Sequence, residues 1–212
     1  MATVSVIILT VNNFGHLLKT ISSVKKQTYP IHEIIVIDQG STQHEYHNYN
    51  WQGIGVKMVH LPSSVLRNST GFIRNKGILM ASGNYVAFCD DTCIWFPDKI
   101  EKQIECMDSQ NCKMSCTDSL YENKKYNATI RYNVLKEKYA TLMDTGFPKV
   151  ITYDILKLGN CIICNSVVVD NELIKAVKGF KNLKDKREEY VCWLELLENT
   201  DCAYIEDACM SS

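Results

Sequence analysis

The chain has 212 residues, a hydrophobic content of 46% and a formal net charge of −1 at pH 7. This length suits one globular domain, since domains commonly run to about 100–200 residues. Acidic and basic residues are balanced, and the sequence lacks the clustered basic residues that binding to a nucleic acid requires. The sequence also lacks a signal peptide and the about 18 consecutive apolar residues of a membrane span. Composition therefore predicts a soluble protein without nucleic-acid partners, and it leaves the oligomeric state open.

Ten cysteines raise the question of disulfides and zinc. The missing secretory signal predicts a reducing, cytoplasmic location, where thiols stay free. Cys161 and Cys164 have the spacing of half a zinc site. They belong to a run that reads as a strand, however, and residues three apart in a strand face opposite sides. Buried free cysteines are therefore favoured over zinc at this place.

The first half of the chain alternates apolar strands with amphipathic helices. The predicted strands cover residues 4–9, 33–37, 56–61 and 85–88, and the predicted helices cover 17–24, 69–81 and a segment that begins at Pro97. Strands that are joined by helices form a parallel sheet with crossover connections. The pattern therefore predicts an α/β fold with a mostly parallel central sheet flanked by helices.

Polar residues follow three of these four strands. They are Thr10 and Asn12, Asp38 and Gln39, and Asp90 and Asp91. In open parallel sheets, ligands bind beyond the carboxyl ends of the strands. The convergence alone therefore predicts a polar ligand such as a nucleotide.

The second half, from about residue 108, is less regular. We expect mixed structure over 108–150, a strand over 160–169, a short helix capped by Asp170, a helix over 188–198 and a last short strand over 203–205. Neither a linker nor an internal repeat separates the halves. The chain therefore reads as a single domain.

Four sequence blocks together resemble the family 2 glycosyltransferases of the GT-A fold. The blocks are 4–13, 27–42, 74–98 and 179–193, in the order of the family. The resemblance implies one GT-A domain, with a Rossmann-like sheet, in which about 1–107 bind the nucleotide sugar and about 108–212 bind the acceptor. It also implies an inverting transferase that moves a sugar from a nucleoside diphosphate sugar, expected to be a UDP-sugar, to an acceptor hydroxyl. The acceptor stays open between a saccharide, a lipid-linked glycan and a protein.

The resemblance assigns the donor to the strand ends and to one arginine. The residues that it implies are Thr10, Val11, Asn12, Asp38, Gln39, Arg74, Asp90 and Asp91. Gln39 departs from the family, which usually has a second Asp there that reaches the base. Because Gln carries both a donor and an acceptor, Gln39 could still pair with uracil or a related base. Asp38 would then order the turn.

The metal-binding Asp-x-Asp motif of the family is altered here. Its first Asp falls on Asp90, and its second, the usual metal ligand, falls on Thr92. A hydroxyl is a poor ligand for a hard cation, but Asp91 could replace it by a small shift of the loop. We expect Mn²⁺ or Mg²⁺, held mainly by Asp91 with Asp90 beside it. Alternatively, the cation binds weakly, or Arg74 and Lys76 carry more of the phosphate charge, or the two acids form a plain polar turn.

The acceptor-side block contains two consecutive acids. The resemblance makes Glu189 the general base that takes the proton of the attacking hydroxyl, with Glu188 as the nearest substitute. The family usually has Asp at the position of Glu189. The alternative is that both are first-turn acids favoured by the helix dipole. A rival function is a sugar-nucleotide-binding protein without turnover, since the metal motif is degraded.

Overall fold

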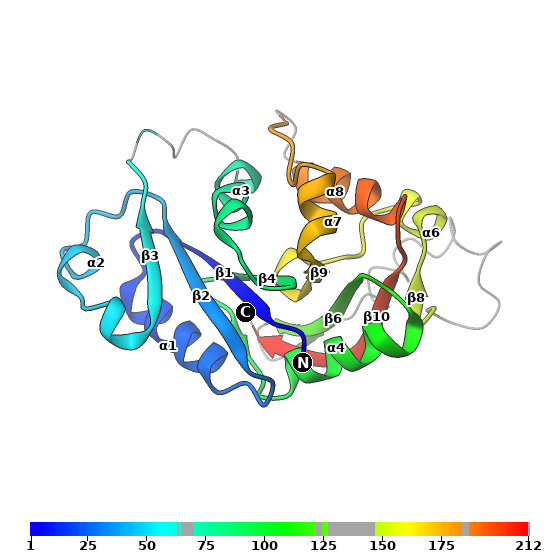
Figure 1. The fold of residues 1–212 in the computed structure, drawn as a ribbon, viewed down its shortest axis with the longest axis horizontal. Coiled ribbons are helices and arrows are strands. Elements are labelled where there is room, and N and C mark those ends of the chain that lie inside the picture. The colour runs from blue at the N-terminus through cyan, green and yellow to red at the C-terminus, as the bar shows by residue number, and fades with distance from the viewer. Residues whose placement is uncertain (63, 65–69, 122–123, 127–146, 184–186, 212) are drawn as a thin grey trace.

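The structure is a computed structural model that describes residues 1–62, 64, 70–121, 124–126, 147–183 and 187–211 (Figure 1). Its strands are β1 (Val4–Thr10), β2 (Ile31–Asp38), β3 (Val56–His60), β4 (Tyr85–Asp90), β5 (Ile94–Trp95), β6 (Met114–Tyr121), β7 (Lys124–Tyr126), β8 (Val150–Ile151), β9 (Val168–Asp170) and β10 (Cys202–Ser211). Its helices are α1 (Phe14–Lys25), α2 (Glu45–Asn48), α3 (Thr70–Met80), α4 (Lys99–Gln110), α6 (Tyr153–Lys157), α7 (Asn171–Ala176) and α8 (Glu188–Leu197), with 3₁₀ turns η1 (Gln52–Ile54) and η3 (Cys164–Ser166). The strands form one sheet in the order β3-β2-β1-β4-β9-β6-β10-β5, with β7 beside β6 and β8 beside β10.

The four strands of the first half run parallel, as the alternating pattern predicts. Helices α3, α7 and α8 cover one face of the sheet, and α1 and α4 cover the other (Figure 1). All seven residues of β1 are buried, because Val4, Val6 and Ile8 face one core while Ile7 and Leu9 face the other. Burial on both faces is the usual reason why parallel strands read as continuous apolar runs.

The sheet reverses direction at β9, which runs antiparallel to both neighbours, β4 and β6. The strand expected over 160–169 is largely wrong, since only its end belongs to β9 and η3 precedes it. At this turn the Ser166 carbonyl accepts hydrogen bonds from Gln103 Nε2 at 2.8 Å and Lys99 Nζ at 3.4 Å. Side chains of α4 thus donate to a carbonyl group that a neighbouring strand would otherwise satisfy. Asp170 does cap α7, by accepting a hydrogen bond from the Leu173 amide at 2.7 Å.

Two strands of the second half differ from the expectation. β6 lies within the region expected to be mixed, and β10 extends well beyond the predicted 203–205. Glu206 and Asp207 in the middle of β10 are exposed, and the pairing register with β6 shifts there. These exposed acids interrupt the apolar pattern from which a strand is predicted. Residues 127–146 of the region expected to be mixed lie outside the described residues.

All ten cysteines are free, and Cys161 and Cys164 are buried in the core. Burial raises the pKa of the Cys164 thiol well above its usual value, so it stays protonated. Metal ligation requires the thiolate. Among the described residues, no group of three His, Cys, Asp or Glu side chains is arranged to hold a metal ion, and no helix there is long and apolar enough to span a bilayer.

Candidate active site

The polar residues that end the parallel strands lie at one edge of the sheet. In the register of the sheet, Thr10 at the end of β1 is opposite Asp38 at the end of β2. On its other side β1 pairs with β4, so that Leu9 is opposite Asp90. The structure therefore brings together the three strand ends that the sequence singled out.

Asp91 follows β4 and holds the loop after β1. Its carboxylate accepts hydrogen bonds from Thr10 Oγ1 at 2.7 Å, from Asn13 Nδ2 at 3.0 Å and from the Val11 amide at 3.3 Å. Only 9% of Asp91 is exposed. Three donors already satisfy this carboxylate, so it differs from the free metal ligand that the sequence led us to expect.

Tyr46 on α2 belongs to the same network, and the sequence did not single it out. Its hydroxyl lies 2.5 Å from Thr10 Oγ1 and accepts a hydrogen bond from the Asn13 amide at 3.0 Å. The ring is fully buried, against Phe14 and Trp51. The concentration of aromatic residues after the turn at Asp38 was the available signal, but no spacing pattern identified the hydroxyl as part of the site.

Asp38 and Asn12 order the two neighbouring loops. The buried Asp38 carboxylate accepts a hydrogen bond from the Ser41 amide at 2.9 Å and lies 2.9 Å from His60 Nδ1. Asn12 has a left-handed φ of 49°, and its side-chain oxygen accepts a hydrogen bond from the Thr42 amide at 2.8 Å. Both side chains are thus engaged within the protein and shape the loops that flank the strand ends.

Other residues that are predicted to bind the sugar donor have their side chains at the surface. Val11 is 38% exposed, Thr92 is exposed and Gln39 is half-buried. The Gln39 amide nitrogen of the backbone donates to the Thr10 carbonyl at 2.9 Å, which fixes the end of β2 against β1. These side chains are accessible for a ligand at the strand ends.

Arg74 on α3 bridges the two halves of the site. Its Nη2 lies 3.2 Å from Asp90 Oδ1, and its Nη1 lies 2.7 Å from Glu189 Oε1 at the start of α8. The arginine side chain is 4% exposed, whereas those of Asp90 and Glu189 are 37% and 33% exposed. One buried guanidinium therefore aligns two accessible carboxylates that are 99 residues apart in the sequence.

The structure separates the two consecutive acids of α8. Glu188 is 5% exposed and accepts a hydrogen bond from Thr70 Oγ1 at 3.3 Å. It packs so closely on α3 that a Cβ added to Gly71 would lie 2.8 Å from Glu188 Cγ. Glu189 instead reaches Arg74 and the surface. Of the two candidates for the base, Glu189 is the one beside Asp90.

A short segment before α8 is fixed to α3. The Asn75 side chain donates to the Phe180 carbonyl at 2.7 Å and accepts from the Phe180 amide at 2.9 Å. Gly179 has a φ of 62°, and a Cβ there would lie 2.3 Å from Asn75 Oδ1. The Phe180 ring in turn lies 5.7 Å from the Arg74 guanidinium. The conformation of this segment thus requires glycine and supports the position of Arg74.

The arrangement offers two partly exposed carboxylates, those of Asp90 and Glu189, and one fixed cation, the Arg74 guanidinium. A guanidinium binds phosphate oxygens well, since its N–H groups match their geometry. A partly exposed carboxylate within hydrogen-bond reach of a hydroxyl can remove its proton. The geometry suits transfer chemistry at the end of the parallel strands.

Comparisons with known proteins identify the family of the chain. The Glycosyl transferase family 2 profile matches residues 5–158. The chain is 28% identical over 211 residues to the putative teichuronic acid biosynthesis glycosyltransferase TuaG of Bacillus subtilis, covering 98% of this chain and 77% of that protein. It is 30% identical over 204 residues to the glucosyltransferase WfgD of Escherichia coli, covering 95% and 72%.

Solved structures show the fold. The chain superposes on S. aureus TarS 1–349 with a TM-score of 0.72 and 16% identity, covering 99% of this chain and 60% of that one. It superposes on the mannosyltransferase PcManGT of Pyrobaculum calidifontis with a TM-score of 0.70 and 14% identity, covering 99% and 56%. The GT-A fold expected from the sequence is therefore confirmed. The chain belongs to glycosyl transferase family 2 and is a glycosyltransferase.

Proposed function

We propose that this protein transfers a sugar with inversion from a UDP-sugar to an acceptor hydroxyl, with Glu189 as the general base. The observation that carries the proposal is the bridge through Arg74, because it sets the base beside Asp90 at the strand ends. All ten cysteines are free, which suits a reducing compartment, and we propose the cytoplasm.

The donor would lie across the ends of β1, β2 and β4. Thr10, Val11 and Asn12 would border the nucleoside, and the half-buried Gln39 amide would pair with the base. Asp38 would act indirectly, since it orders the turn that presents Gln39. Uridine is favoured because TarS has been solved with UDP and with UDP-GlcNAc, and WfgD is named for UDP-Glc.

The fold family implies a divalent cation, and Asp90 fits it better than Asp91. Mg²⁺ and Mn²⁺ are commonly held by one or two carboxylates together with substrate phosphates. Asp90 is 37% exposed, whereas hydrogen bonds from the protein satisfy Asp91. PcManGT was solved with GDP-Man and Mn²⁺. A cation at Asp90 would neutralise the charge that develops on the diphosphate as the sugar departs.

Arg74 would couple donor binding to the base. In the structure its guanidinium donates to Glu189 at 2.7 Å, so this carboxylate oxygen is engaged with the arginine rather than with a substrate group. A bound diphosphate would compete for this guanidinium. Glu189 would then be released to accept the proton of the acceptor hydroxyl as its oxygen attacks the anomeric carbon and the diphosphate leaves.

For the acceptor, we propose a lipid-linked saccharide. Two relatives, WfgD and WfaP, are named for acceptors in which a GlcNAc is attached to diphosphoundecaprenol. The attacking group would be a sugar hydroxyl, which suits a carboxylate base. The proposal extends only to this class of acceptor.

The donor assignment is tested by thermal unfolding of the wild-type protein with UDP, GDP and ADP, each with Mn²⁺ or with a chelator. A ligand that binds only the native state raises its stability, by about 2.7 kcal/mol at a hundred times its Kd. We expect UDP with Mn²⁺ to raise the Tm most. If neither a nucleoside diphosphate nor its sugar shifts the Tm at millimolar concentration, the donor site is assigned wrongly.

The second candidate is a binding protein without turnover. Thr92 at the usual metal position is the observation that favours it. It predicts a Tm shift by UDP-sugar but no release of UDP, in the presence of lipid-linked or soluble acceptors. If the wild type releases UDP steadily, and this release stops when the acceptor is omitted, the binding protein without turnover is excluded.

A further inference from the structure

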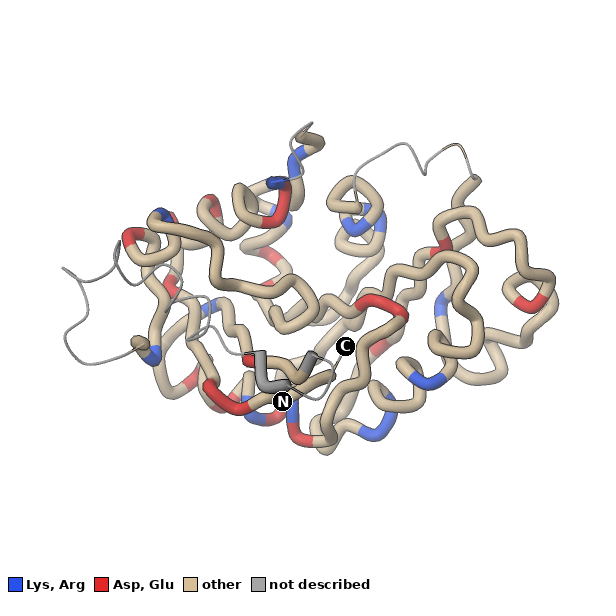
Figure 2. The backbone as a smooth tube through the Cα atoms, turned by 180° about the vertical axis from the view of Figure 1, so that it is seen from behind, with Lys and Arg blue, Asp and Glu red and all other residues tan. Residues whose placement is uncertain are grey.

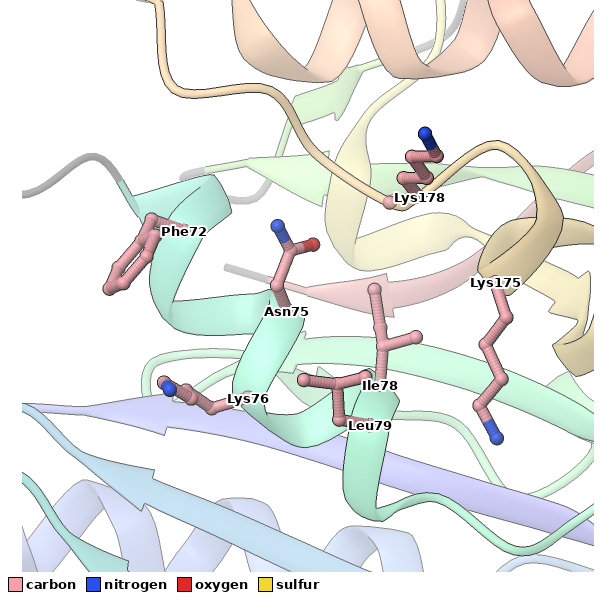
Figure 3. A pocket seen from close by; sticks show the side chains of 8 residues that line it. Phe72, Asn75, Lys76, Ile78, Leu79, Lys175 and Lys178 are labelled. Carbon is pink, nitrogen blue, oxygen red and sulfur yellow. The ribbon is translucent and has the colours of Figure 1, made fainter.

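A cavity of about 370 Å³ lies between α3 and the segment formed by α7 and the turn after it (Figure 3). Six of the residues that line it are Phe72, Lys76, Ile78, Leu79, Lys175 and Lys178. Its volume falls within the range of small-molecule sites, about 300–1,000 Å³. The proposed chemistry does not take place in it, although Asn75 and Gly179, which support the position of Arg74, also line it. We call it the α3–α7 pocket.

The wall on the α3 side is apolar and open to solvent. Leu79 is 73% exposed and the adjacent Met80 is 41% exposed. Phe72 and Leu79 lie on α3 facing outward along the pocket (Figure 3). Large exposed side chains grouped in this way mark a contact surface more often than isolated ones do.

Three lysines border this apolar wall. Lys76 Nζ lies 5.7 Å from the centroid of the Phe72 ring, and Lys175 Nζ donates to the Ala81 carbonyl at 2.9 Å, just after α3. Lys178 is exposed in the turn after α7, where its φ of 65° fixes the backbone. Lys175 projects from the last turn of α7 and Lys178 from the loop that follows it (Figure 3). The positive charge therefore surrounds the pocket.

No acidic residue is among the described residues that line the pocket. Helix α3 itself has basic residues and no acid. Elsewhere on the molecule, whose net charge is −1, acidic and basic residues are interspersed (Figure 2). The positive charge of the pocket is thus a local feature that favours an anionic ligand.

We propose that the α3–α7 pocket docks the protein on a membrane surface that contains anionic phospholipids. The head-group phosphates would contact the three lysines, while Leu79 and Met80 would enter the boundary between head groups and acyl chains. A free phosphate would leave the apolar wall uncovered. A second copy of the chain would place like charges against each other. The proposal is independent of the donor and of the acceptor.

The test is co-sedimentation of the full chain with phosphatidylcholine vesicles, with and without phosphatidylglycerol. We expect binding only to the anionic vesicles, weakened by salt because exposed charges are screened. Each lysine near the surface contributes about a fivefold change in affinity. Lys76→Ala/Lys178→Ala should therefore weaken binding about 20-fold or more, and Leu79→Ser about tenfold through lost apolar burial.

The matched control is Lys26→Ala/Lys113→Ala, which removes two exposed lysines from other faces. It should bind as the wild type does, and the far-ultraviolet circular dichroism and Tm of all variants should match. The proposal is overturned if the wild type does not bind anionic vesicles, if the pocket variant binds as well as the wild type, or if the control loses as much. Dimerisation in analytical ultracentrifugation that Leu79→Ser abolishes would also overturn it, in favour of a second copy.

Discussion

The candidate active site holds its carboxylates in two different ways. On one side, the loop side, Asp91 is buried and accepts hydrogen bonds from Thr10, Val11 and Asn13. On the other, the bridge side, Asp90 and Glu189 are 37% and 33% exposed and share the guanidinium of Arg74. The two sides meet at neighbouring positions of the chain, since Asp90 and Asp91 are consecutive.

The difference in burial and in hydrogen bonding between the two sides shows which carboxylates remain available to a substrate. Donors that lose their acceptor away from water cost the protein desolvation free energy, so the Asp91 carboxylate, with one buried and two part-buried donors, stabilises the folded β1 loop. A partly exposed carboxylate that is held by one cation can exchange that partner for a substrate group. Sequence neighbours can therefore have unlike roles, and we propose a structural role for Asp91 and a functional one for Asp90.

The largest expected effect is on the bridge side, for Glu189→Gln. This variant is nearly isosteric but cannot accept the proton, so transfer should fall by about 10²–10⁴-fold. The affinity for UDP should not fall, because the nucleoside would lie at the other strand ends and the variant would hold Arg74 less strongly against a bound diphosphate. Rates of UDP release and titration of each variant with UDP measure the two quantities.

Glu188→Gln is the matched control for this prediction. Glu188 is buried against α3 and does not reach Arg74, so its replacement should cost transfer far less than Glu189→Gln. Full turnover by Glu189→Gln would mean that the base lies elsewhere. A larger loss for Glu188→Gln at equal stability would mean that the two acids have exchanged roles.

The next effect contrasts the two consecutive aspartates. Asp91→Ala leaves three donors of the β1 loop without their acceptor and should lower the free energy of unfolding by about 2–4 kcal/mol. Asp90→Ala should lower it by less, since the buried Arg74 keeps its ion pair with Glu189, and should instead weaken binding of UDP that depends on Mn²⁺. Urea unfolding and UDP titration with and without chelator separate these effects. Equal losses of stability would remove the distinction between the two sides.

A smaller effect tests the same rule outside the site, at Glu33 on β2. Its carboxylate accepts hydrogen bonds from Ser5 Oγ at 2.6 Å, from Lys57 Nζ at 2.6 Å and from Ser82 at 2.7 Å. Burial acts to raise the pKa of Glu33, but these hydrogen bonds outweigh it and lower the pKa to about 2. The depressed pKa stabilises the folded protein above the usual pKa of 4.5, and this stabilisation is lost as the pH falls toward 2.

Glu33→Gln should therefore lower the free energy of unfolding at pH 7 by about 1–3 kcal/mol. The difference between wild type and variant should shrink as the pH falls from 4.5 toward 2, as measured by urea unfolding at several pH values. Transfer at saturating substrate should not change. A difference that stays constant across this pH range would show that the ionised carboxylate is not the cause.

The first half of the fold was predictable from the sequence because its strands are buried on both faces. Each strand therefore appears in the sequence as an apolar run. The polar residues that follow these runs predict the edge of the sheet at which a ligand would bind. The position of Glu189 was predicted from the resemblance alone. The bridge through Arg74 was not predicted, since no local pattern shows that one guanidinium reaches residues 90 and 189 together.

The second half was harder to predict because its order depends on contacts between distant residues. The strand expected over 160–169 gives way to η3, where Lys99 and Gln103 bind the Ser166 carbonyl. The saturation of Asp91 depends likewise on where the β1 loop folds. The spacing of apolar residues predicts the helices and strands. The tertiary structure decides which polar groups come into contact.

The position of β9 has a consequence for kinetics. This strand is hydrogen-bonded to β4 on one side and to β6 on the other, and so joins the first half of the chain to the second half in one sheet. A hinge motion between the halves would break this ladder. We therefore expect substrates to enter and leave through motions of loops and side chains, on their nanosecond-to-microsecond scale rather than that of domain closure. Product release would then be governed by local contacts, such as those of Arg74 with the diphosphate.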